Sequence, residues 1–298
     1  MPQSSSRRAP LFATLASTLF VRYTLSDDLR DLETSILQST HAILLPFPLQ
    51  RNIIPTFFFL TKALFHRALR SKLPGDVTCC LNYLYYTRNP SFERLGTTHN
   101  EVITLLVRTL TLRMELEPGN AMQCLEEMAV LCREQLASNQ ELHGAVEPFA
   151  EAVITRMFDP PSQQIVECLC EANARLPNSY IVSITLSKSF LLRFMITLST
   201  EDYEGAMAPL DRIITSRSPA ESPNKHLTEA LAAAAQIARS FHGTPEFLEE
   251  AISRTRAHLI STSLEDPKHA EAMCNAEVIE ASPLQSLQGL DNVLTGQL

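Results

Sequence analysis

The sequence predicts an all-α protein, an α-solenoid of about six to seven antiparallel helix hairpins repeating about every 44 residues. Two markers keep this period. An arginine recurs at intervals of 45, 46, 43, 37 and 46 residues, and a small residue with an aliphatic neighbour follows each arginine after 11 to 13 residues. The arginines are Arg22, Arg67, Arg113, Arg156, Arg193 and Arg239, and the small residues are Ser35, Cys80, Cys124, Cys168, Ala206 and Ala251.

One repeat unit is predicted to be two helices joined by a short turn. In the fifth unit, residues 180–194 carry apolar side chains at three- and four-residue spacing, which indicates a helix. A break at Leu198 and Ser199 follows, and Thr200 precedes the acidic pair Glu201 and Asp202. A hydroxyl side chain ahead of carboxylates is typical of a helix start. The hydroxyl caps free N–H groups, and the carboxylates stabilise the positive end of the helix dipole.

The same register predicts every other element. First helices are expected at 9–24, 51–70, 98–114, 142–157, 180–195 and 225–241, and second helices at 28–42, 76–88, 119–137, 162–175, 202–215 and 246–261. A seventh first helix is expected at 266–281 and a weaker last one at 284–295. The predicted organisation is therefore a tail at 1–8, the repeat array at 9–281, and a weak C-terminal helix and tail at 282–298. No alternation of period two is sustained between turns, so strands are not expected.

The two markers have physical interpretations. A small side chain lets two helix backbones approach closely, which explains why serine, cysteine and alanine interchange. The arginine lies near the end of a first helix, where a cation faces the negative helix terminus. It is also expected to reach acids on the second helix, although the second unit shows no such acid nearby. The candidate acids are Glu33, Glu126, Glu167, Glu204 and Glu249.

Arg22-Tyr23 and Arg193-Phe194 form an arginine–aromatic step near the end of a first helix. Other residues fit the same pattern, namely Leu32, Tyr203 and Leu248 three before the small residue, and Pro223, Lys225, Pro267 and Lys268 at the starts of first helices. This pattern resembles the degenerate tetratricopeptide-like repeats of mushroom-forming fungi. The resemblance covers about residues 9–281, is strongest at both ends, and has a period longer than the 34 residues of standard repeats. It implies protein binding on a concave face lined by first helices.

Composition limits the function classes. A net charge of −8 and a pI near 5.5 argue against nucleic acid as the main partner, since phosphate binding needs a clustered basic surface. Seven cysteines, an odd number, fit a reducing compartment and predict a cytoplasmic protein. The cysteine pairs lack zinc-type spacing, so neither a metal nor another cofactor is expected.

Two apolar stretches could be mistaken for membrane or targeting segments. Arg7 and Arg8 followed by residues 11–21 have the form of a secretory leader, but Arg22 and Tyr23 continue the repeat register there. Residues 53–65 are too short to span a bilayer. We therefore expect a first helix in the first case and a buried helix in the second, without a membrane partner.

Asp27, Asp28 and Asp31 spell DDxxD, the magnesium-binding motif of the all-helical terpene synthases. The competing interpretation is the start of a second helix, because Leu32 and Ser35 continue the repeat. A synthase also needs a second metal motif, which the chain does not show, and an aromatic-rich cavity. The chain has no tryptophan. A magnesium-dependent enzyme is therefore kept as the alternative.

The sequence favours a non-catalytic scaffold for protein–protein interaction. Exposed polar residues of first helices are the candidates for contact with a protein or peptide, namely Lys188, Lys225 and Arg239. Two further alternatives stay open. The chain could be a shortened piece of a larger repeat-containing regulatory protein, or it could associate end to end with itself, because solenoid ends need polar caps.

Overall fold

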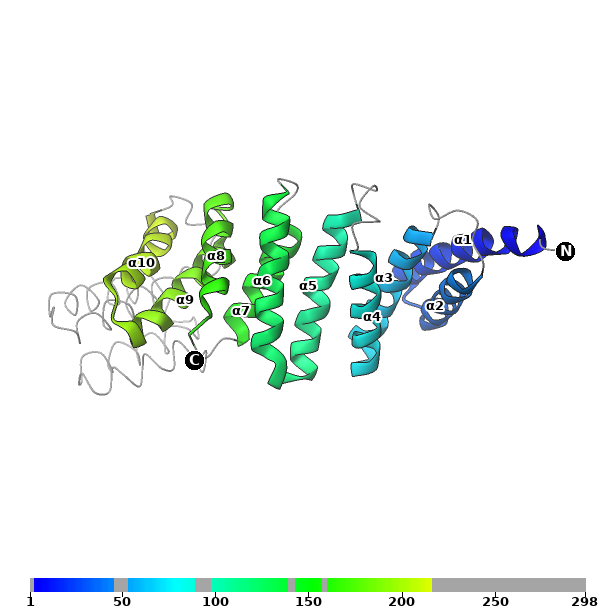
Figure 1. Ribbon diagram of the computed structural model, residues 1–298, viewed down its shortest axis with the longest axis horizontal. Coiled ribbons are helices and arrows are strands. Elements are labelled where there is room, and N and C mark those ends of the chain that lie inside the picture. Colours follow the sequence, from blue (N-terminus) through cyan, green and yellow to red (C-terminus); the bar gives the residue numbers. More distant parts are fainter. Residues whose placement is uncertain (1–2, 46–52, 89–97, 139–142, 157–159, 216–298) are drawn as a thin grey trace, which may run out of the picture. The chain divides into compact units, whose positions relative to one another are not determined.

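A computed structural model describes residues 3–45, 53–88, 98–138, 143–156 and 160–215 (Figure 1). These residues form ten α-helices and one short 3-10 helix, and no strand occurs among them. The all-α prediction is confirmed for this part of the chain. The helices expected at 225–241, 246–261, 266–281 and 284–295 lie outside the described residues, and so do Lys225, Arg239 and Ala251.

All ten helices expected within the described ranges form, mostly within two or three residues of the predicted ends. Helix α1 differs most, because it begins six residues early and continues through Pro10. The helices are α1 (Gln3–Ser26), α2 (Leu29–Leu44), α3 (Ile53–Ser71), α4 (Pro74–Thr87), α5 (Thr98–Leu116), α6 (Ala121–Ala137), α7 (His143–Arg156), α8 (Gln163–Arg175), α9 (Tyr180–Thr197) and α10 (Thr200–Thr215), with η3 (Pro118–Asn120) before α6.

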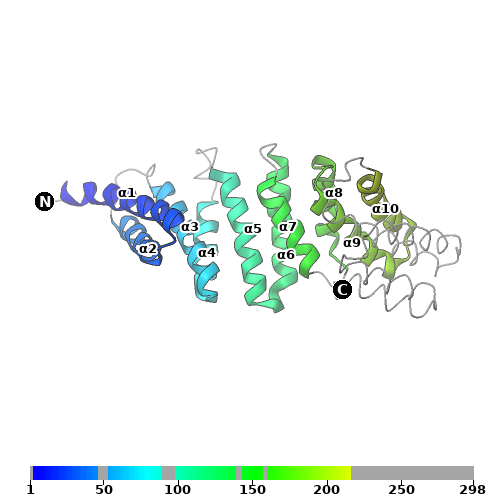
Figure 2. The ribbon, with the colours of Figure 1, turned by 180° about the vertical axis from the view of Figure 1, so that it is seen from behind.

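The chain divides into two compact units, residues 1–149 and 150–298, with the boundary inside α7. In the first unit, α1 to α6 each contact the next helix along the chain, and Figures 1 and 2 show them following one another in chain order. Two further contacts, α1 with α3 and α3 with α5, link alternate helices. We call α1 and α2 the first helix pair, α3 and α4 the second, and so on to α9 and α10, the fifth.

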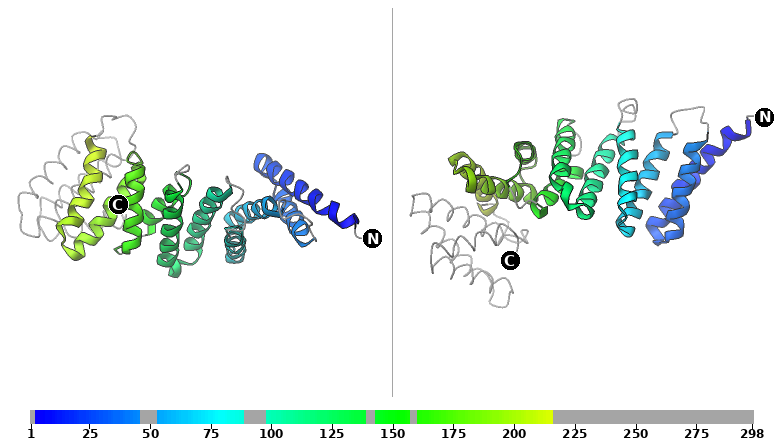
Figure 3. Two further views of the ribbon diagram at one scale, coloured as in Figure 1. Left: turned by 45° about the horizontal axis from the view of Figure 1, so that its top comes forward. Right: turned by 60° about the horizontal axis from the view of Figure 1, so that its bottom comes forward.

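The second unit is organised around α9, which contacts α8 and α10 (Figure 3). Most of α9 is buried, including Ser183, Thr185, Ser187 and Ser189. Thr185 Oγ1 donates to the Ala150 carbonyl of α7 at 3.2 Å, and Ser183 Oγ donates to Asn173 Oδ1 of α8 at 2.9 Å. These bonds satisfy polar atoms that would otherwise be costly to bury.

Two of the small residues contact the backbone of the other helix of their pair. Ser35 Oγ donates to the Ala16 carbonyl at 2.8 Å, and Cys80 Sγ donates to the Thr61 carbonyl at 3.5 Å, in each case 19 residues back along the chain. A side chain that reaches the backbone of the facing helix leaves no room for a larger one. Ser35, Cys80, Cys124, Cys168 and Ala206 are all buried.

Enlarging one of these residues should destabilise the fold. We expect Ala206→Leu to lower the free energy of unfolding by about 1–3 kcal/mol, because the buried contact is already filled. Ala208→Leu is the matched control, since Ala208 lies two residues away on the exposed face of α10. Urea denaturation compares the two variants, and equal losses would show that Ala206 is not at a tight contact.

Candidate functional site

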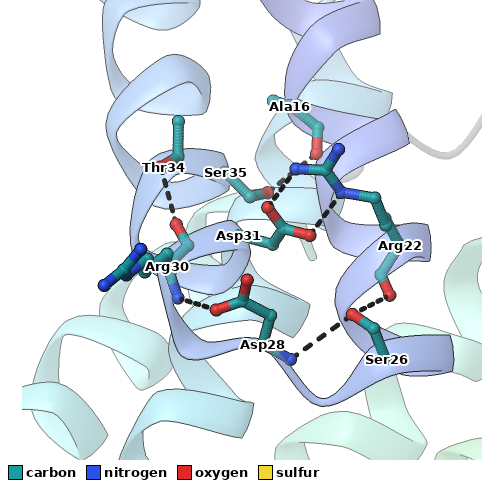
Figure 4. Close-up of polar contacts among 8 residues, drawn as sticks. All are labelled: Ala16, Arg22, Ser26, Asp28, Arg30, Asp31, Thr34 and Ser35. Atoms are coloured by element: carbon teal, nitrogen blue, oxygen red, sulfur yellow. Dashed lines mark hydrogen bonds and ion pairs between the residues drawn. The ribbon is translucent and has the colours of Figure 1, made fainter.

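The DDxxD residues lie in the turn between α1 and α2 and in the first turn of α2 (Figure 4). Asp28 is the N-cap of α2, and its Oδ1 accepts a hydrogen bond from the Arg30 backbone N–H at 2.9 Å. Asp31 accepts two hydrogen bonds from the guanidinium of Arg22, which lies on α1. These hydrogen bonds hold the pKa of the Asp31 carboxyl below its usual value.

The third carboxylate, Asp27, forms an ion pair with Arg70 of α3. The three carboxylates therefore have three different partners: Arg22 and Arg70 connect to other helices, and the Arg30 N–H is capped at the start of α2. Among the described residues, no group of three or more His, Cys, Asp or Glu side chains is placed to hold a metal ion. The geometry accounts for this motif as the start of a second helix.

The Arg22–Asp31 contact recurs in other helix pairs at the same spacing of nine residues. Arg67 donates to Asp76 through Nε at 3.1 Å and Nη2 at 2.7 Å. Arg193 Nη2 lies 3.2 Å from Asp202 Oδ1. Each aspartate is in the first turn of its second helix and four residues before the small residue. We call this contact the arginine–aspartate joint.

The backbone around the joint also repeats. The fifth residue after the arginine has positive φ in all three pairs, at Asp27 (59°), Lys72 (54°) and Leu198 (57°). This residue ends the first helix in the left-handed conformation, and its N–H bonds back to a helix carbonyl at 2.7–2.9 Å. The residue before it is Ser26, Ser71 or Thr197, and in the second and fifth pairs its hydroxyl donates to the aspartate of the joint.

The third pair is built differently. Arg113 Nε donates at 3.1 Å to Glu117, only four residues later, and Asn120 Nδ2 donates to the same oxygen at 2.9 Å. The connection contains η3, which starts at Pro118. Here the arginine and the small residue are 11 residues apart, compared with 13 in the three pairs that carry the joint. Spacing between the two markers therefore separates the two kinds of turn. Arg156, at 12 residues, is exposed at the end of α7.

The acids expected on the second helices were in part the wrong partners. Arg22 contacts Asp31 and not Glu33, and Arg193 contacts Asp202 and not Glu204. The second pair does have an acidic partner for Arg67, namely Asp76, although no acid was expected there. The available signal was an aspartate four residues before the small residue, within the first turn of the second helix.

The joint arginine also reaches the preceding helix pair. Arg67 Nη1 donates to Glu33 Oε2 of α2 at 3.2 Å. In the second unit, Arg193 Nη1 donates to Gln163 Oε1 of α8 at 2.8 Å. A guanidinium presents several donors in one plane, so one side chain can hold two partners at once. These two arginines therefore connect the two helices of their own pair and one helix of the pair before.

Lys188 was expected on an accessible surface, and this expectation is wrong. Its side chain is buried, with 7% of the residue exposed, and Nζ donates to the Ile154 carbonyl of α7 at 2.9 Å. That carbonyl lies in the last turn of α7, where carbonyl groups lack partners within the helix. Burial lowers the pKa of the Lys188 ammonium. Lys188 thus caps the C-terminal end of α7 inside the protein.

An aromatic cluster joins the first helices of the first two pairs. His66 of α3 packs edge-on against Phe20 and Tyr23 of α1, with ring centroids 5.4 and 5.6 Å apart. The guanidinium of Arg70 lies 5.7 Å from the centre of the Tyr23 ring. Burial, followed by the charge of Arg70, lowers the pKa of His66, while Asp27 opposes the shift.

The cysteines of the described residues are all free thiols. Four are buried, namely Cys80, Cys124, Cys132 and Cys168, while Cys79 and Cys170 are exposed. Burial raises the pKa of the Cys80 thiol to about 12, so this side chain acts in packing. Within the described residues, α9 alone has the length and hydropathy to cross a membrane, and 61% of that stretch is buried in the protein.

No protein-family model, curated protein or solved structure matches this chain. The functional argument therefore depends on the fold and on the residues described above.

Breaking the joint in the fifth pair should destabilise the protein. Asp202 has 5% of its side chain exposed, so Arg193→Met would leave a nearly buried carboxylate without its cation. We expect a loss of about 1–3 kcal/mol in the free energy of unfolding. Adding Asp202→Asn should recover part of this loss, because it removes the isolated charge. Chemical denaturation measures both variants beside Arg212→Met, an exposed arginine of α10.

His66 should make stability depend on pH. Because its folded-state pKa lies below the usual 6.5, the stability that neutral His66 contributes is complete above pH 6.5 and is lost as the pH falls through the folded-state value. The His66→Phe variant keeps a ring in the cluster but cannot be protonated. Thermal denaturation across this range should show a larger acid-induced loss for the natural protein, and parallel curves would contradict the assignment.

Proposed function

We propose that this protein is a non-catalytic scaffold for protein–protein interactions, built as an α-solenoid of tetratricopeptide-like antiparallel helix hairpins. The recurrence of the arginine–aspartate joint at one register position in three helix pairs is the observation that supports it most. Contacts between helices are mostly between chain neighbours, as expected for repeats that stack on their neighbours alone. Arrays of this kind offer extended surfaces to a partner.

The free thiols support a cytoplasmic location for this function. Buried thiols on helix faces persist where glutathione keeps cysteines reduced. We do not propose a magnesium-dependent enzyme, because Asp27, Asp28 and Asp31 each make a structural contact. The proposal therefore assigns the chain no catalytic residue and no cofactor.

The first helices α3 and α5 provide a candidate binding surface. Glu101, Arg108 and Glu115 recur every seven residues along α5, so they share one line on its surface. Lys62 of α3 lies 3.6 Å from Glu101, and Lys72, which follows α3, lies 3.1 Å from Glu115. We call these five residues the α3–α5 surface. Both of its acids are paired within the protein.

Arg108 is the remaining charge of the α3–α5 surface. It is exposed, and it forms no ion pair with another residue in the part of the chain that the structure describes. A guanidinium on a line between two paired acids can bind a carboxylate of a partner in two-pronged geometry. The proposed partner is thus a protein or peptide segment with an acidic side chain opposite Arg108.

Charge reversal at Arg108 tests this surface. Tagged protein would be used to capture partners from cell extract, with captured proteins quantified by mass spectrometry. Arg108→Glu should deplete specific partners strongly, since an acid would then face an acid. Arg30→Glu is the matched control, because Arg30 is an exposed arginine on a second helix. Identical captured sets for all three proteins would contradict the proposed surface.

The solenoid itself is tested separately by small-angle X-ray scattering coupled to size-exclusion chromatography in reducing buffer. An elongated particle would support a stacked array, because each repeat contacts only its neighbours. A particle with the radius of gyration of a compact globule of this length would overturn it.

A further inference from the structure

Two ion pairs bracket Arg108 on the α3–α5 surface. Lys62 of α3 lies 3.6 Å from Glu101 of α5, and Lys72, just after α3, lies 3.1 Å from Glu115. The two ion pairs follow each other in the same order along both helices, so α3 and α5 lie side by side and run in the same direction. Arg108 lies on α5 between the two glutamates, about two helical turns from each.

Helix α3 exposes an apolar side chain at about the level of Arg108. Leu69 follows Lys62 by seven residues, as Arg108 follows Glu101 by seven. Residues seven apart share nearly the same face of a helix, so Leu69 lies on the face of α3 that carries Lys62. Leu69 is 40% exposed, and among residues 56–71 of α3 it is the only large apolar side chain that is exposed. A cation and an apolar side chain therefore lie on neighbouring helices between the two ion pairs.

We propose that Arg108 and Leu69 form one binding site for an extended segment of a partner protein, with an acidic residue and a large aliphatic residue two positions apart. This inference rests on the proposed scaffold function and specifies the segment that the scaffold binds. The carboxylate of the segment accepts two hydrogen bonds from the Arg108 guanidinium. The aliphatic side chain packs on Leu69 and removes its exposed apolar surface from water.

The distance between the two helices determines the spacing within the segment. The axes of packed helices are about 8–10 Å apart. In an extended chain, side chains two positions apart point to the same side and are about 7 Å apart. A segment that crosses α3 and α5 therefore places one side chain over each helix, and the long Arg108 side chain spans the remaining distance. Residues two apart in a helical segment do not face the same side, so a helix would not present this pair.

The two ion pairs determine where along α5 the segment binds. At the level of either ion pair, the carboxylate of the segment would approach Glu101 or Glu115, each of which already has a lysine partner. The side chains of these glutamates are 57% and 42% exposed, so they face an approaching segment and repel its acid. Binding is therefore favoured at the level of Arg108. Charge selects the position of the acid, and Leu69 selects the aliphatic side chain.

Selection of random phage-displayed peptides on the full chain tests the inference. Peptides enriched by the natural protein should carry Asp or Glu with Leu, Ile, Val or Met two positions away. Arg108→Glu should replace the acidic residue with a basic one and keep the aliphatic residue, whereas Leu69→Ala should keep only the acidic residue. Leu37→Ala is the matched control, because Leu37 is an exposed leucine of α2. Enriched peptides without the acid–aliphatic pair, or no enriched peptide, would overturn the inference.

Titration of the most enriched peptide by fluorescence anisotropy measures the two contacts separately, with circular dichroism to confirm that each variant is folded. We expect Leu69→Ala to weaken binding about three- to tenfold, and Arg108→Glu to weaken it at least about tenfold. A peptide with Lys in place of its acid should bind Arg108→Glu more tightly than it binds the natural protein. Equal affinities of the natural protein and Leu69→Ala would overturn this inference alone. The proposed function fails separately, if the natural protein and Arg108→Glu capture identical sets of proteins from extract.

Discussion

Three of the five helix pairs depend on one contact, in which an arginine at the end of the first helix binds an aspartate nine residues later. Because the aspartate is buried, loss of this contact should lower the free energy of unfolding. Asp31, Asp76 and Asp202 each have 12% or less of the side chain exposed, so the carboxylate needs its cation. The joint fixes how the second helix leaves the turn, and the small residue four positions later then meets the facing helix. In Arg67 and Arg193 the same guanidinium also holds the preceding pair.

The sequence contained enough information to place all ten described helices, because two markers of one period fixed the register of each unit. It did not identify the aspartate of the joint. Asp31 was considered only within DDxxD, and Asp76 was not recognised as a partner because no acid was expected near Arg67. The left-handed residue was also missed, since Asp27, Lys72 and Leu198 share no side-chain chemistry. Only the 13-residue spacing between the arginine and the small residue distinguishes the three helix pairs that carry the joint.

The candidate site was harder to predict, because exposure depends on which side of a helix its neighbours cover. Lys188 lies on a first helix, as candidates for partner contact should, but α9 is enclosed and the ammonium satisfies a helix end in α7. Arg108 lies on a less enclosed first helix and stays at the surface. Periodicity alone gives the face of a helix that packs on its own pair. It does not show how many other helices cover the remaining faces. That coverage is the reason why Lys188 is buried and Arg108 is exposed.

Double-mutant cycles centred on Arg67 test the central claim most directly. Arg67→Met, Asp76→Asn and Glu33→Gln would be measured singly and in pairs by chemical denaturation. We predict a coupling energy of about 1 kcal/mol between Arg67 and Asp76, and a smaller one between Arg67 and the more exposed Glu33. That result would show one arginine connecting both its own pair and the pair before. Additive effects in both cycles would contradict the account, because the helix pairs would then be held without the joint.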